Sequence, residues 1–123
     1  MLQNTLYNVK ENLLKKCILN EKQVDLLIKN MKFWKVGKTI YPSQLKSLLY
    51  VDFKKVYEIL EFIKKLGILE YNYEIYCSKC DKFIDSPPLK SLNQFPKDLY
   101  CDDNHKLSPL TDTILIYKVI CNE

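Results

Sequence analysis

Two short loops of this chain carry paired side chains that bind soft metal ions. Cys77 and Cys80 are separated by two residues, and Cys101 and His105, further along, by three. Each loop presents two donors from one tight turn, and two such loops complete the tetrahedron that zinc prefers. Three thiolates and one imidazole leave no coordination position for water or substrate. The spacing therefore predicts one structural Zn²⁺ ion bound by these four residues.

The second loop leaves alternatives open, because CxxxH is a less usual zinc loop than CxxC. If His105 is not the fourth ligand, we expect Cys121 or Asp102 to replace it. Another interpretation is that these are ordinary surface cysteines and a lone histidine. A CxxC pair also serves thiol–disulfide exchange, but this pair does not stand at the start of a helix that follows a strand.

The sequence offers no catalytic residues. Its only histidine is assigned to the metal, so no nucleophile–base pair can be drawn from it. It also lacks a glycine-rich phosphate loop, since it contains only two glycines. We therefore expect a protein that is not an enzyme.

Length and composition favour a small globular protein. With 123 residues and 47% hydrophobic residues, the chain can form one domain, or one small domain beside a metal-stapled one. No apolar run reaches the length of a membrane span, and the first residues do not resemble a signal peptide. Five cysteines without a secretion signal favour thiols or metal over disulfides. We expect a cytoplasmic protein with no membrane partner.

The charge of the chain is uneven and comes from lysine alone. Residues 1–75 carry a surplus of five lysines over acids, whereas residues 76–123 carry one more acid than lysine. No arginine is present, although arginine is the preferred side chain for reading guanine and for gripping phosphate. A protein without arginine therefore lacks the side chain best suited to sequence-specific DNA recognition.

Hydrophobic spacing predicts three helices before residue 50. The first helix covers residues 3–17 and could also mediate a homodimer. The second begins with an Asn20–Gln23 capping box and ends near Lys32. A short strand at 39–41 precedes the third helix, which begins at Pro42. Their expected apolar positions are Leu2, Leu6, Val9, Leu13 and Cys17, then Val24, Leu27, Ile28 and Met31, then Leu45, Leu48 and Leu49.

A fourth helix and two longer strands follow. Asp52 is expected to cap a helix that runs to about Lys65, and Gly67 to form its left-handed C-terminal cap. Residues 68–76 are rich in aromatic and β-branched side chains, which predicts one strand, or two with a turn near Asn72. Residues 113–120 predict a final strand. The expected apolar set of the fourth helix is Phe53, Val56, Ile59, Leu60, Ile63 and Leu66.

This order of elements resembles a winged helix-turn-helix, particularly from Tyr41 through the Gly67-Ile68-Leu69-Glu70 exit, and residues 77–105 look like a zinc ribbon. The combination is similar to the general transcription factor E alpha family, whose ribbon uses four cysteines where this chain has His105. The resemblance implies an α+β fold of about four helices and a short β-wing, with a winged helix-turn-helix domain at 1–76 and a zinc-ribbon domain at 77–123.

In DNA-binding winged helices, the helix after the turn enters the major groove. In this chain that helix is the predicted fourth helix. Its most outward positions are Lys54, Glu58, Glu61 and Lys65, which balance in charge as two pairs four residues apart. The expected wing carries Glu70 and Glu74 and no lysine. Both elements that would touch DNA therefore carry acids, which favours a protein contact.

Exposed aromatic side chains suit that contact. We expect Tyr57, Phe62, Tyr71 and Tyr73 to bind a protein partner, although Tyr57 and Phe62 could instead pack against the wing or the first helix. The leading hypothesis is thus a non-catalytic interaction module that docks on a larger assembly, which could itself handle nucleic acid.

The alternative hypothesis is a small DNA-binding transcriptional regulator. Lys32, Lys35 and Lys38, interleaved with Phe33 and Trp34, are its candidate contacts to a nucleic-acid backbone. The same segment also fits a turn that is anchored in the core and carries solvated lysines.

Overall fold

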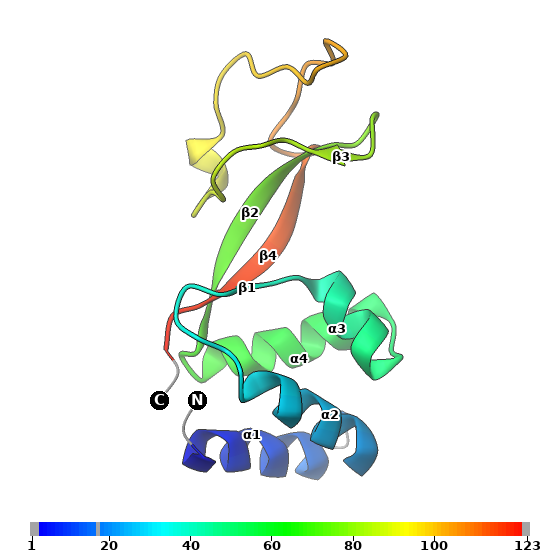
Figure 1. The fold of residues 1–123 in the computed structure, drawn as a ribbon, viewed down its shortest axis with the longest axis vertical. Helices are drawn as coiled ribbons and strands as arrows, with labels where there is room; N and C mark the ends of the chain where they lie inside the picture. The colour runs from blue at the N-terminus through cyan, green and yellow to red at the C-terminus, as the bar shows by residue number, and fades with distance from the viewer. Residues whose placement is uncertain (1–2, 17, 122–123) are drawn as a thin grey trace. The chain divides into compact units, whose positions relative to one another are not determined.

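The computed structural model of the chain describes residues 3–16 and 18–121. Its elements are α1 (Gln3–Lys15), α2 (Glu21–Met31), β1 (Thr39–Ile40), α3 (Pro42–Leu49), α4 (Phe53–Lys65), β2 (Leu69–Cys77), β3 (Lys82–Phe83), a 3-10 turn η1 (Leu92–Gln94) and β4 (Thr113–Val119) (Figure 1). The strands form one sheet in the order β1-β4-β2-β3. Helices and an antiparallel sheet make this an α+β fold, as predicted.

The chain divides into two compact units. The first unit consists of residues 1–70 and 118–123, and the second unit of residues 71–117. The predicted boundary after Tyr76 falls inside β2. The division lies instead after Glu70, and the end of the chain returns to the first unit.

Local capping signals set the start of α2 as predicted. The Asn20 Oδ1 atom accepts a hydrogen bond from the Gln23 backbone N–H at 2.8 Å, and Gln23 Oε1 accepts one from the Asn20 N–H at 3.1 Å. These two bonds form the predicted capping box and satisfy donors that a helix start leaves unpaired. Gln23 Nε2 also donates to the Leu49 carbonyl at 2.9 Å, which ties α2 to the end of α3.

The helices of the first unit enclose its core. Helix α1 packs against α2, α2 against α3, and α3 against α4, and Figure 1 shows this succession in the blue-to-green part of the ribbon. Helix α1 ends at Lys15, and Leu2 and Cys17 of its expected stripe lie outside the described residues. The buried helix positions are Leu6, Val9 and Leu13 of α1, Val24, Leu27 and Met31 of α2, and Pro42, Leu45 and Leu49 of α3.

Helix α4 is capped and buried largely as predicted. Asp52 Oδ1 accepts from the Lys55 backbone N–H at 2.9 Å, and Gly67 adopts a φ of +83° after the helix. Its buried residues are Val56, Ile59, Leu60 and Ile63. Phe53 and Leu66 were expected beside them but are 46% and 45% exposed. Phe53 is the first residue of α4 and Leu66 directly follows its last, so they lie at the two ends of the stripe.

Backbone hydrogen bonds from the end of the chain complete the first unit. The Val119 carbonyl accepts from the Gly37 N–H at 2.8 Å, and the Val119 N–H donates to the Lys38 carbonyl at 2.9 Å. On the other side, the Ile120 N–H donates to the Ile68 carbonyl at 2.9 Å. Val119, the last residue of β4, is therefore hydrogen-bonded to the segment before β1, and Ile120 to the residue before β2.

The second unit is built on β2. This strand pairs antiparallel with β3, with Tyr76 opposite Phe83 and Cys77 opposite Lys82. Asn72 does not mark a turn, because β2 is one continuous strand and Asn72 is buried within it. A separate small core forms here from Ile75, Cys77, Cys101 and Leu107, with Ile84, Leu89, Phe95 and Leu99 packed against it.

Among the described residues, no helix combines the length and the apolar character that crossing a membrane requires.

Candidate metal centre

The first ligand loop is a tight turn at the end of β2. Cys77 is the last residue of that strand, and its carbonyl accepts a hydrogen bond from the Asp81 N–H at 2.8 Å. Asp81 adopts a φ of +55°, a left-handed conformation that aspartate tolerates better than most residues. The turn reverses the chain, so the side chain of Cys80 points back toward that of Cys77.

The second ligand loop closes on itself in a similar way. The Asn104 N–H donates to the Cys101 carbonyl at 2.9 Å, and the Cys101 N–H donates to the His105 carbonyl at 3.0 Å. Asn104 supplies the left-handed residue, with a φ of +63°. The His105 N–H also donates to Cys101 Sγ at 3.4 Å. Hydrogen bonds of this kind stabilise a thiolate before any metal binds.

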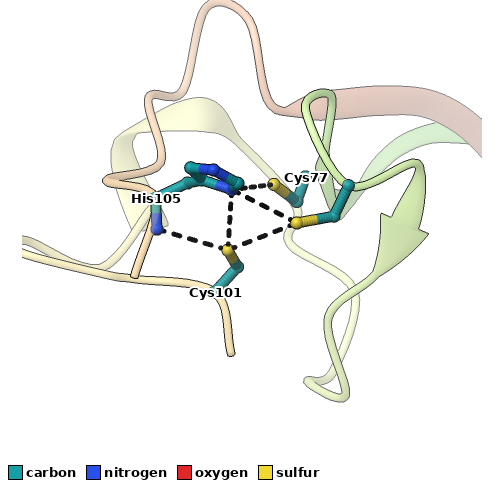
Figure 2. A group of neighbouring side chains, drawn as sticks. Cys77, Cys101 and His105 are labelled. Atoms are coloured by element: carbon teal, nitrogen blue, oxygen red, sulfur yellow. Dashed lines mark hydrogen bonds between the residues drawn. The ribbon is translucent and has the colours of Figure 1, made fainter. Parts of the chain in front are cut away.

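The four predicted ligands converge on one point. Their ligand atoms all lie within 4.8 Å of one another, and Figure 2 shows Cys77, Cys101 and His105 directed toward a common centre. His105 Nδ1 lies 3.8 Å from Cys77 Sγ, 3.2 Å from Cys80 Sγ and 3.3 Å from Cys101 Sγ, and the sulfurs of Cys80 and Cys101 are 3.6 Å apart. His105 therefore completes this group, which includes neither Cys121 nor Asp102.

These separations fit a tetrahedral metal ion. With Zn–S and Zn–N bonds of about 2.3 and 2.05 Å, a tetrahedron places sulfurs about 3.8 Å apart and a sulfur about 3.5 Å from the nitrogen. The three distances from His105 Nδ1 to the sulfurs, and that between the sulfurs of Cys80 and Cys101, lie within about 0.4 Å of those values. Cys77, Cys80, Cys101 and His105 could thus hold one metal ion with little rearrangement.

The surroundings of the thiols favour a bound cation. Cys77 and Cys101 are buried in the small core of the second unit, while Cys80 and His105 are half-buried. Burial raises the pKa of the Cys101 thiol, but the backbone N–H groups of His105 and Asp103 outweigh it and lower that pKa to about 7. A hydrogen bond with the Asp103 carboxylate, at 3.2 Å, and burial raise the pKa of Cys80. A bound metal ion would favour the deprotonated form of both thiols.

Asp112 supports the first loop, and the sequence analysis did not identify it. Its side chain is buried and accepts hydrogen bonds from the Ser78 N–H at 3.0 Å, Ser78 Oγ at 2.8 Å, the Ser108 N–H at 2.8 Å and Thr111 Oγ1 at 3.1 Å. It thereby joins the Cys77–Cys80 turn to the segment before β4. A Thr-Asp-Thr triplet ahead of a strand is the only sequence signal for it, and that triplet is equally common on surfaces.

We expect Asp112→Asn to destabilise the second unit by roughly 1.5–3 kcal/mol at neutral pH, because hydrogen bonds to a charged group are lost. Burial raises the pKa of Asp112, but the N–H groups of Ser78 and Ser108 lower it to about 2, below its ordinary value of 3.8. The carboxylate therefore contributes its full stabilisation at a pH above its ordinary pKa. This stabilisation is lost as the pH falls through its pKa in the folded protein.

Thermal unfolding of the wild type and the variant measures this difference. The gap in stability should be equal at pH 7 and pH 5. Asp85→Asn is the control, since Asp85 is an exposed acid of the same unit. A gap that changes between pH 7 and pH 5, or a control that loses as much stability, would contradict the role given to Asp112.

The structure separates the four aromatic residues expected to bind a partner. Tyr57 and Phe62 belong to α4 in the first unit, and Tyr71 and Tyr73 to β2 in the second unit. The Lys16 ammonium lies 4.8 Å from the centre of the Phe62 ring. This contact to the end of the first helix favours the alternative in which Phe62 is a packing residue.

Tyr57 and the two strand tyrosines have intramolecular neighbours as well. The Tyr57 ring lies 6.4 Å from that of Phe53, and Tyr71 lies 5.6 Å from Tyr117. Tyr73 pairs with Leu89 through its backbone, with both hydrogen bonds at 2.8 Å. Tyr57 also lines a shallow hollow on the outer face of α4, together with Asp52, Lys54, Lys55, Glu58 and Glu61.

The outward charges of α4 balance, although Glu58 does not form the predicted pair. Glu58 lies 3.6 Å from the Lys55 ammonium, three residues away, whereas the spacing predicted a pair with Lys54. Lys54 and Glu58 are exposed as expected. The face therefore mixes both signs of charge around Tyr57.

The basic turn between α2 and β1 is anchored in the core. Trp34 is 1% exposed, and its Nε1–H donates to Asn30 Oδ1 at 3.0 Å, whereas the neighbouring Phe33 is 76% exposed. Lys32, Lys35 and Lys38 are all exposed around this anchor. The arrangement matches the core-anchored alternative and still leaves the lysines accessible.

Comparison with known proteins identifies no family. No protein-family model matches the chain, and no solved structure matches it. An ATP synthase gamma chain from Wolbachia pipientis subsp. Culex pipiens (strain wPip) is 29% identical over 102 residues, which cover 79% of this chain and 34% of that protein. The chain thus spans about a third of the length of the curated relative it matches.

Proposed function

We propose that this protein is a non-catalytic interaction module whose second unit is held together by one structural zinc ion and whose first unit docks on a protein partner. The observation that carries the proposal is the cluster of three thiols and one imidazole whose ligand atoms lie within 4.8 Å of one another. All four donors come from the protein. A site closed in this way stabilises a fold and offers no position for a substrate.

The donor set favours zinc over other metals. Soft thiolates select zinc, copper(I) or iron–sulfur clusters, and an added imidazole in a tetrahedral site is typical of zinc. Iron–sulfur clusters are mostly held by four cysteines. The four ligand atoms also lie within 4.8 Å of one another, which is too close for ligands that surround a cluster of several iron atoms. A single small ion fits between them.

The architecture that we propose is a winged helix-turn-helix followed by a zinc ribbon. In support of this assignment, α3 and α4 are joined by a tight turn in which Tyr50 has a φ of +56°, and β2 follows α4 directly. Two ligand loops beside an antiparallel β-ribbon are the parts of a zinc ribbon. In this assignment α4 is the recognition helix, and its outer face is the binding surface.

Charge on that face favours a protein over DNA as the partner. Asp52, Glu58 and Glu61 line the hollow beside Lys54 and Lys55, and Lys55 is already paired with Glu58. Carboxylates pressed toward phosphates would oppose binding to DNA. A mixed-charge rim around a half-buried tyrosine instead resembles the surface of a polar protein interface.

Site-specific photo-crosslinking in cells tests the docking face. A photoreactive residue at Lys54 should give one discrete crosslinked protein, whereas one at Tyr7, which is exposed on α1, should not. Glu58→Lys should reduce the Lys54 crosslink at least tenfold without changing the amount of folded protein. Equal crosslinking from the two positions, or no effect of Glu58→Lys, would contradict docking through α4.

The exposed lysines of the α2–β1 turn favour a second candidate function, a small DNA-binding regulator. Three phosphate contacts by Lys32, Lys35 and Lys38 would give a slope of log K against log salt of about −2.7. Our main proposal expects no binding of random duplex DNA in a fluorescence-polarisation titration at low salt. Micromolar binding with that slope, abolished by changing all three lysines to glutamate, would establish the second candidate instead.

A further inference from the structure

The ligand group contains one thiol that is more exposed than the others. Cys77 is fully buried and Cys101 nearly so, whereas Cys80 is half-buried. All three cysteines line a cavity of about 80 Å³ that Phe83 and Asp103 also border. The cavity is large enough for a molecule of the size of water or hydrogen peroxide. Oxidation of the group would therefore start at Cys80.

The sulfur of Cys80 already touches that of Cys101. The two atoms are 3.6 Å apart, and a disulfide requires about 2.05 Å, so each sulfur must move by less than about 1 Å. Both residues belong to loops: Cys80 lies in the turn after β2, and Cys101 lies outside any strand. Cys77, by contrast, is held by the strand β2. Loop residues can make this small movement more easily than a strand residue.

We infer that Cys80 and Cys101 form an oxidation site, at which hydrogen peroxide creates a disulfide and thereby releases the metal ion; this inference rests on the proposed zinc centre. The Cys80 sulfur attacks one peroxide oxygen, the O–O bond breaks, and the departing hydroxide takes a proton and leaves as water. The Cys101 sulfur then attacks the sulfenic acid at Cys80. The S–S bond forms, the S–O bond breaks, and a second water leaves.

The two steps balance without another reactant. The sulfurs together lose two electrons, one peroxide molecule gains them, and two protons from the thiols or from solvent complete the two waters. Cys77 and His105 then remain as the only two of the four ligands. Two donors do not retain a zinc ion that needs four. Oxidation therefore removes the metal and destabilises the second unit.

Digestion after lysine resolves the pairing, because Lys79 separates Cys77 from Cys80. Cys77 lies on the peptide 66–79, Cys80 on 80–82, Cys101 on 98–106 and Cys121 on 119–123. After one equivalent of peroxide acts on the metal-loaded full chain, mass spectrometry of unreduced peptides should show 80–82 linked to 98–106. A zinc indicator dye should report one ion released per disulfide, and dithiothreitol with added zinc should reverse both changes.

The controls separate this inference from the zinc proposal. Cys121→Ser removes a thiol outside the ligand group and should leave peptide linkage and metal release unchanged. A purified protein without bound metal would defeat the zinc proposal itself. Three results from a protein that holds one zinc ion would overturn the Cys80–Cys101 assignment alone. These are a link between peptides 66–79 and 80–82, a link that involves peptide 119–123, and retention of the metal until methionine is oxidised.

Discussion

Cys101→Ser is expected to reduce bound zinc from one equivalent to nearly none and to unfold the second unit. Cys101 is buried in the small core and touches the other ligand groups. Serine is a poor zinc ligand, and the remaining donors leave the tetrahedron open. Apparent binding free energies of structural zinc reach roughly 10–16 kcal/mol, and in small units that energy is folding energy. The few buried apolar residues of the second unit cannot replace it.

Elemental analysis and two-dimensional amide NMR measure the two effects. Resonances of residues 71–117 should lose their dispersion, while those of the helices α1–α4 should keep it. Cys121→Ser is the matched control and should change neither zinc content nor dispersion. If Cys101→Ser keeps one zinc ion, or keeps a dispersed second unit without zinc, the cluster does not stabilise this part of the chain.

Trp34→Ala should destabilise the first unit by about 3–5 kcal/mol, the usual cost of truncating a buried aromatic residue to alanine. Trp34 is among the largest fully buried side chains. Its removal also leaves Asn30 Oδ1 without the hydrogen bond it now accepts from Nε1. Because small domains are stable by only about 5–15 kcal/mol, this change removes a large share of the stability.

Urea unfolding followed by far-UV circular dichroism tests this value, since the variant lacks the only tryptophan. The adjacent Phe33→Ala is the control. Phe33 is exposed, so its loss should change stability by less than about 0.5 kcal/mol. Similar losses for the two variants would show that the turn between α2 and β1 is not anchored as the structure indicates.

Features that depend on neighbours in the sequence were predictable. The capping box at Asn20, the proline that starts α3 and the left-handed Gly67 all act within about four residues of themselves. The structure contains each of them. The ligand group belongs to the same class, because each zinc loop is a local turn and the ligand spacing is short enough to read from the sequence.

Features that depend on distant segments were not predictable in the same way. Periodicity placed Phe53 and Leu66 in the core, but it cannot tell where the core ends along a helix. It also left open whether residues 68–76 form one strand or two with a turn near Asn72, and the structure shows one continuous β2 in which Asn72 is buried. Likewise, the return of the chain's end to the first unit depends on hydrogen bonds between Val119 and the Gly37–Lys38 segment.

Asp112 shows the same limit at the metal centre. Asp112 stabilises the first ligand loop through hydrogen bonds from Ser78, which lies 34 residues earlier in the sequence. No local sequence pattern relates the two residues. The ligands could be listed from the sequence, whereas the group that holds their loop in place required the structure.

X-ray absorption spectroscopy at the zinc edge of the purified full chain can identify the metal ligands. We predict three sulfur ligands at about 2.3 Å and one nitrogen at about 2.0–2.1 Å, with no oxygen bound to the zinc. A first shell with an oxygen from water or carboxylate, or with fewer than three sulfurs, would contradict a closed structural site made by Cys77, Cys80, Cys101 and His105.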